Sequence, residues 1–126
     1  MEPEPAPQAE IKAEKLPSQI AEQLSPTERD ALGHPVRRQI LRALNESSEP
    51  RSPGEIAAVT LPHTGVSVVS YHAQVLENCD SIVMTGTRNA HGNVARLYAS
   101  KVAGDEQIAA VLQATRGLDR WAADPR

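Results

Sequence analysis

Apolar residues recur at helical spacing along the first third of the chain, and short polar runs separate them. Leu16, Ile20 and Leu24 lie four positions apart, which predicts a short helix. Residues 25–28 (SPTE) have the pattern of a capping box with proline at the first helical position. A second helix is therefore predicted to begin there and to end near Gly33.

Residues 35–45 predict a core helix with one apolar side, formed by Val36, Ile40 and Leu44. Arg38 and Arg42 are expected on the opposite side, where their guanidinium groups could reach phosphates. Arg37 falls inside the apolar arc, so we expect it to form an ion pair with another helix.

A second capping box at residues 52–55 (SPGE) opens a short helix, and residues 61–65 (LPHTG) form a turn before a longer helix. At about 100° per residue, this longer helix divides into two halves. The apolar half contains Val66, Val68, Val69, His72, Ala73, Val75, Leu76 and Cys79. The polar half contains Ser67, Ser70, Tyr71, Gln74, Glu77 and Asn78.

The polar half of this helix suits contacts with base edges or phosphates, because its hydroxyl, phenol and amide groups both donate and accept hydrogen bonds. A solvated surface helix usually carries Lys, Arg and Glu, whereas Glu77 is the single charge here. On the apolar half we interpret His72 as a hydrogen-bonded core histidine and Cys79 as a small buried apolar residue.

Two strand-like runs follow, residues 82–85 and 94–98, and the turn-forming residues 88–93 (RNAHGN) separate them. The last periodic segment is residues 105–121, predicted as one helix with an apolar stripe that needs a partner. The stripe consists of Ile108, Val111, Leu112, Thr115, Leu118 and Trp121.

This order of elements predicts a mainly α fold with a small β-hairpin wing, the winged helix-turn-helix that reads double-stranded DNA. We expect residues 1–15 to be a disordered, acidic and proline-rich tail, and residues 16–122 to form the domain. Within it, residues 66–79 are the predicted recognition helix, 81–99 the wing hairpin and 105–121 a dimerisation helix.

Composition narrows the class of protein. A chain of 126 residues allows one modest domain with tails, and its single cysteine permits no internal disulfide. No apolar run approaches the roughly 18 residues that span a membrane. The amino terminus is acidic where a signal peptide would be basic, so we expect a soluble cytoplasmic protein that binds no membrane. Three aromatic residues are too few for base stacking on single strands.

The net charge of −3 is unevenly distributed. Residues 1–30 hold seven acidic and three basic residues, and residues 31–100 hold five acidic and six basic residues. The predicted DNA-binding part is thus barely basic, which is weak electrostatics for neutralising phosphates. A dimer would double the available charge.

Three segments together resemble the ArsR-type winged-helix regulators of bacteria. Residues 31–41 (ALGHPVRRQIL) look like the family's opening segment. Residues 52–57 (SPGEIA) are similar to its first motif helix, and residues 69–76 (VSYHAQVL) to its recognition helix. The resemblance covers about residues 31–100. It implies a homodimer built on the terminal helices that represses transcription by occupying an operator.

The chain departs from this pattern in ways that affect function. Metal-sensing members carry a cysteine pair where this chain has Ser52 and Gly54, so the thiolate site is missing. Residues 104–126 also contain no histidine for a metal site on the last helix. We expect no metal and no cofactor. Asp80 stands where a glycine commonly ends the recognition helix, and Asp tolerates left-handed geometry better than most residues.

The sequence therefore predicts a dimeric transcriptional regulator, acting as a repressor at an inverted-repeat operator in double-stranded DNA. Enzyme activity is not expected, because no nucleophile, acid pair or phosphate loop is evident. The candidate DNA-binding residues are Ser67, Ser70, Tyr71, Gln74, Arg88, Asn89, His91, Arg38 and Arg42. The candidate dimer-interface residues are Leu16, Ile20, Leu24, Ile108, Val111, Leu112, Thr115, Leu118 and Trp121.

Two alternatives stay open. The same fold could serve as a protein-interaction module that does not bind DNA specifically, because the recognition helix has no cation. A sensor with an effector at the dimer interface is also compatible, although nothing in the sequence identifies a small molecule.

Overall fold

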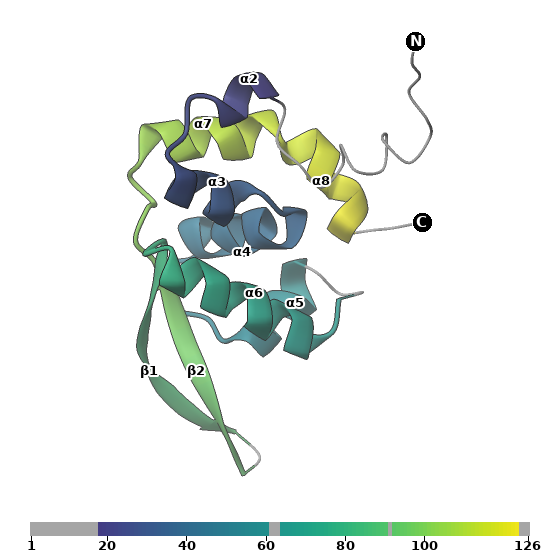
Figure 1. Ribbon diagram of the computed structural model, residues 1–126. Coiled ribbons are helices and arrows are strands. Elements are labelled where there is room, and N and C mark those ends of the chain that lie inside the picture. The colour runs from purple at the N-terminus through teal and green to yellow at the C-terminus, as the bar shows by residue number, and fades with distance from the viewer. Residues whose placement is uncertain (1–17, 61–63, 91, 124–126) are drawn as a thin grey trace.

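The computed structural model describes residues 18–60, 64–90 and 92–123 (Figure 1). Helices dominate, and an antiparallel two-stranded hairpin follows the first five of those described, which confirms the predicted fold class at this level. The elements are α2 (Ser18–Ala21), α3 (Pro26–Leu32), α4 (Pro35–Glu46), α5 (Pro53–Thr60), α6 (Val66–Asn78), β1 (Ile82–Ala90), β2 (Asn93–Ser100), α7 (Glu106–Ala114) and α8 (Arg116–Ala123).

Both predicted capping boxes are present. The Ser25 hydroxyl accepts a hydrogen bond from the Glu28 amide at 3.1 Å, and the Glu28 carboxylate accepts one from the Ser25 amide at 2.9 Å. The same reciprocal pair joins Ser52 and Glu55 at the start of α5, at 2.9 and 3.2 Å. These bonds satisfy backbone donors that a helix start leaves unpaired, so the local sequence fixes where α3 and α5 begin.

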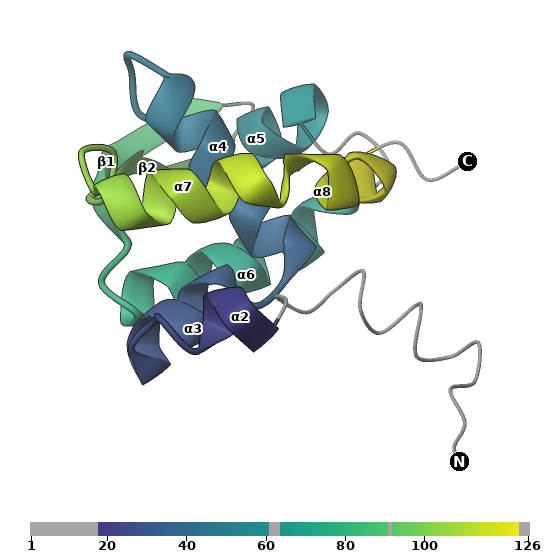
Figure 2. The same ribbon diagram turned by 90° about the horizontal axis from the view of Figure 1, so that it is seen from above.

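Helix α4 lies at the centre of the molecule. Its apolar residues Ile40 and Leu41 are fully buried, and it contacts α3, α5, α6, α8 and β2. Figures 1 and 2 show α7 and α8 lying across α4 on the side away from α5 and α6. Helix α4 is therefore covered on two sides, by α6 on one side and by the carboxyl-terminal helices on the other.

The hairpin is attached to the body at its base and projects past the helices (Figure 1). Tyr98 of β2 exchanges two backbone hydrogen bonds with Arg51, at 2.8 and 2.9 Å, so the loop before α5 adds a short third pairing that the sequence did not predict. Asp80, with φ of 63°, adopts the left-handed geometry expected at the end of α6, and Gly92 in the hairpin turn has φ of 83°.

The predicted single helix over residues 105–121 is wrong, because α7 and α8 are separate helices joined at Thr115. Arg42 Nη2 donates to the Leu112 carbonyl at 2.7 Å and to the Thr115 hydroxyl at 2.8 Å. The arginine thus satisfies a carbonyl that the next helical turn would otherwise need.

Arg38 and Arg42 face inward, which overturns their predicted contact with phosphates. Arg38 is fully buried, and its Nε and Nη2 donate to the two carboxylate oxygens of Asp119 in α8 at 2.7 and 2.6 Å. Arg42 is 5% exposed and donates to the same carboxylate at 2.8 Å. The prediction failed because α8 covers this side of α4, and helical periodicity alone does not show which neighbour will pack there.

The predicted dimer stripe is also mostly internal. Buried within the single chain are Leu24, Ile108, Val111, Leu112 and Thr115. They pack in the chain's own core because α7 and α8 fold back on α4. Ile20 is half-buried and Leu118 is 39% exposed. Leu16 and the side chain of Trp121 lie outside the residues that the structure describes.

Candidate nucleic-acid interface

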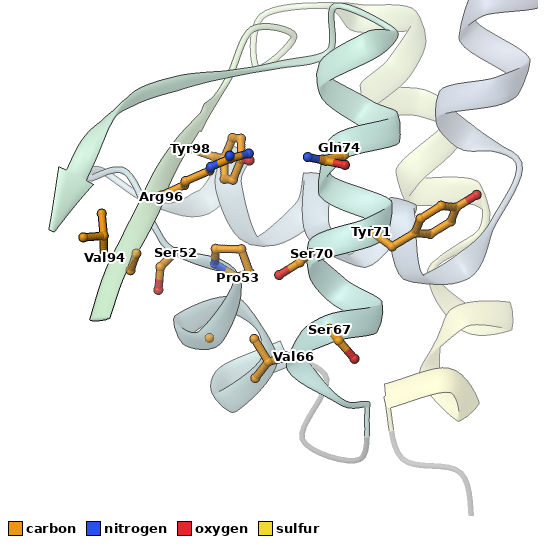
Figure 3. Close-up of a pocket in the computed structure, with 12 residues that line it drawn as sticks. Ser52, Pro53, Val66, Ser67, Ser70, Tyr71, Gln74, Val94, Arg96 and Tyr98 are labelled. Atoms are coloured by element: carbon orange, nitrogen blue, oxygen red, sulfur yellow. The ribbon is translucent and has the colours of Figure 1, made fainter. Parts of the chain in front are cut away.

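A groove of about 630 Å³ runs between α6, the start of α5 and strand β2 (Figure 3). Helix α6 forms one wall, and β2 forms the other. The side chains that line it include the capping residue Ser52, Pro53 of α5, Ser70, Tyr71 and Gln74 of α6, and Val94, Arg96 and Tyr98 of β2.

Helix α6 presents its predicted polar half outward. Ser67 and Gln74 are exposed, Tyr71 is 63% exposed and Ser70 is half-buried. In Figure 3, Ser70 and Gln74 point toward the hairpin side of the helix, whereas Tyr71 points to the other side. A duplex approaching α6 would therefore meet hydroxyl, amide and phenol groups across the whole outer face.

Val66 and Val68 were predicted to face the core, but they are 51% and 44% exposed. They lie at the two borders of the apolar half, and α6 buries only the middle of that half, where Val69, Ala73 and Leu76 are fully buried. The first turn of α6 consequently adds two aliphatic side chains to the accessible face.

Arg96 is a groove residue that the sequence analysis missed. It is exposed on β2 and lies on the same face of the strand as Val94 and Tyr98. Figure 3 shows its side chain extending between Tyr98 and Gln74. The alternation of residues 94, 96 and 98 was the signal that could have found it, because successive side chains of a strand point to opposite faces.

Comparison with known proteins agrees with this geometry. Residues 32–78, from the end of α3 to the end of α6, match the model of a family described as a helix-turn-helix domain. This similarity suggests a DNA-binding regulator, a class that is typically not enzymatic. No curated protein and no solved structure matches the chain.

Arg88 of the wing is engaged within the protein. Its guanidinium is 2.5 Å from the Glu55 carboxylate of the first motif helix, and the two side chains are 47% and 34% exposed. The Ser52 backbone N–H, followed by Arg88, lowers the pKa of Glu55, so this partner stays ionised. A phosphate would have to compete with Glu55 for Arg88. Asn89 is exposed, and His91 lies outside the described residues.

His72 lies on the buried side of the recognition helix, as predicted, with 8% of its surface exposed. Its ring stacks on His34 at 4.3 Å between centroids, and its Nδ1 has no hydrogen-bond partner, contrary to the expected hydrogen-bonded histidine. Burial lowers the pKa of His72 to about 4, and the nearby His34 and Arg37 add to this effect. His72 is therefore neutral at pH 7 and does not face DNA.

Two further residues, Arg37 and Cys79, were also predicted to face the protein interior. Arg37 has no ion pair among the described residues and its Nε is buried without a hydrogen bond, so the predicted ion pair is wrong. Cys79 is partly buried against the core, and burial raises the pKa of its thiol. A protonated thiol is a poor nucleophile, which favours a packing role.

Metal-binding residues do not gather in the part of the chain that the structure describes, where no group of three or more His, Cys, Asp or Glu side chains could hold an ion. Ser52 and Gly54, the positions that the sequence resemblance aligns with the cysteine pair of metal-sensing ArsR-type regulators, have local structural roles. Ser52 caps α5, and Gly54 lies beside it in the groove. Among the described helices, none is long and apolar enough to cross a membrane.

Proposed function

We propose that this protein is a sequence-specific regulator of transcription that represses genes by occupying an operator, like the ArsR-type regulators that its sequence resembles. The outward face of α6 carries the proposal, because its exposed Ser67, Tyr71 and Gln74 border a groove open to a duplex. An α-helix fits the major groove, and the projecting hairpin can follow the adjacent backbone.

Gln74 is the residue we assign to base recognition. Its amide can donate to N7 and accept from N6 of adenine in a bidentate pair. The first experiment is selection of bound sequences from a random pool of duplexes by the full chain. We then expect Gln74→Ala to cost about 1–3 kcal/mol of binding free energy on the selected site, with the loss confined to one base position. An equal loss on random DNA would exclude this role.

Arg96 is assigned to the phosphate backbone, since it is the exposed cation that lines the groove. We expect Arg96→Ala to weaken binding similarly on all sequences and to reduce the salt slope of log K by about 1. Titrations at several salt concentrations measure this slope. Arg116→Ala, which removes an exposed arginine of α8 outside the groove, should leave it unchanged. A sequence-dependent loss for Arg96→Ala would instead indicate base contact.

A homodimer completes the proposal. Within the described carboxyl-terminal helices, Ala110 and Ala114 are exposed one turn apart on α7 and Leu118 is exposed on α8, and a groove joins the two alanines to Ile20 of α2. We propose that this surface meets a second copy, replacing the buried stripe predicted from the sequence. Two recognition helices would then enter successive major grooves about 34 Å apart. Inverted half-sites in the selected duplexes would support the dimer, and single half-sites would contradict it.

A protein-interaction module is the second candidate. Two observations favour it: α6 has no lysine or arginine, and Arg88 is paired with Glu55. This candidate predicts that no duplex is enriched from the pool at moderate salt, which separates it from the first.

A further inference from the structure

The exposed side chains of the recognition helix differ in chemistry from those that read guanine. We infer that this helix reads a half-site core of A·T base pairs, with Gln74 on adenine and Val66 on the methyl group of thymine. The inference deepens the proposed function and depends on it. It rests on which side chains α6 exposes, and on where the nearest cations lie.

Guanine is most often recognised by an arginine or lysine that donates two hydrogen bonds to O6 and N7. None of the thirteen residues of α6 is a lysine or an arginine, and its one histidine, His72, is buried. The two wing arginines lie off the helix, because Arg96 belongs to β2 and Arg88 is paired with Glu55. Helix α6 therefore has no side chain suited to the commonest guanine contact, whereas the Gln74 amide matches the donor and acceptor of adenine.

Val66 supplies the apolar part of the recognition. It lies in the first turn of α6, is 51% exposed and lines the groove. The amino-terminal residues of a recognition helix are those that contact base edges. An aliphatic side chain there has no hydrogen bond to offer, but it can bury the C5-methyl group of thymine, the one apolar feature of the major groove.

The test uses the full chain and the duplex selected from the random pool. Thymines of the half-site are replaced one at a time by uracil, which lacks the methyl group, and adenines by 7-deazaadenine, which lacks N7. We expect one uracil substitution to weaken binding by about three- to five-fold, the worth of one buried methyl group. Val66→Ala should remove this sensitivity, and Gln74→Ala should remove the sensitivity to 7-deazaadenine.

Val59→Ala is the matched control, because Val59 is 82% exposed on α5 and does not line this groove. It should keep both sensitivities. Selected half-sites with a G·C core, or a uracil effect that persists in Val66→Ala, would overturn the inference while leaving specific DNA binding intact. Failure to enrich any duplex would overturn the proposed function, and the inference with it.

Discussion

Replacing Asp119 by asparagine is expected to lower the free energy of unfolding by about 3–5 kcal/mol, because it leaves two buried guanidinium groups without their counter-charge. Asp119 is fully buried in α8 and accepts hydrogen bonds from both Arg38 and Arg42 of α4. Asparagine keeps the shape of the side chain but replaces one acceptor oxygen by an NH2 donor, so the loss reports the charge together with the hydrogen bonds made to that oxygen. Urea titration followed by circular dichroism measures it.

The effect is expected to be large because Arg38 and Arg42 also donate hydrogen bonds to other buried groups. Arg38 also donates to the Leu32 carbonyl at 2.7 Å, and Arg42 donates to Gln39 at 2.8 Å and to the end of α7. Without the carboxylate, these groups still need partners away from water. We expect α8 to detach from α4 before the rest of the domain unfolds, because Asp119 makes the buried charged contacts between the two helices.

An exposed ion pair provides the control for the Asp119 experiment. Arg116 and Glu46 also join α8 to α4, at 3.2 Å, but their side chains are 53% and 65% exposed. Solvent screens such a pair, so Glu46→Gln should cost less than about 1 kcal/mol. Equal losses for Glu46→Gln and Asp119→Asn would show that the buried network contributes nothing special to stability.

Signals confined to a few neighbouring residues predicted much of this fold. The two capping boxes placed the starts of α3 and α5, and the turn signal before Val94 located the hairpin, although β1 continues to Ala90 through residues predicted as turn. The polar arc of α6 likewise identified the side chains that are exposed along the groove. Each of these features depends on hydrogen bonds or periodicity within one element, which the sequence contains in full.

The errors arose where two distant elements meet. Whether Arg38 faces water or protein depends on Asp119, which is 81 residues away in sequence. The break at Thr115 depends on Arg42, and the exposure of Val66 depends on how much of α6 the body covers. Helical periodicity gives the direction of a side chain from its own axis only. It does not indicate what lies in that direction.

Helix α4 connects the carboxyl-terminal helices to α6. One side of it carries the charged network to α8, and the other packs against the recognition helix. The outward polar face of α6, which we propose reads bases, is therefore oriented through α4 by the same core that fixes the carboxyl-terminal helices. We therefore expect a substitution in the Asp119 network to weaken the proposed DNA binding without touching the groove.

Lowering the pH is expected to destabilise the domain through His72. The pKa of this residue is about 4 in the folded protein and 6.5 in its ordinary state, because burial and the nearby His34 and Arg37 oppose its protonation. Above pH 6.5 the imidazole is neutral in both states and contributes no pH dependence. Between pH 6.5 and 4 only the unfolded chain takes up the proton, so stability falls as the pH falls.

The loss should total about 3 kcal/mol and be complete below pH 4, where both states are protonated. His72→Met removes the titrating group and keeps an uncharged side chain that adapts to its site. Urea midpoints of both proteins from pH 7.5 to 4 measure the effect. Above pH 6.5 the two stability curves should run parallel. Below it, the wild type should lose stability relative to the variant. Curves that stay parallel over the whole range would show that folding does not lower the pKa of His72. The ring of His72 lies edge-on to that of Tyr71, with 5.0 Å between centroids, so the same pH range should also affect the outward polar face of the helix, which we propose reads bases.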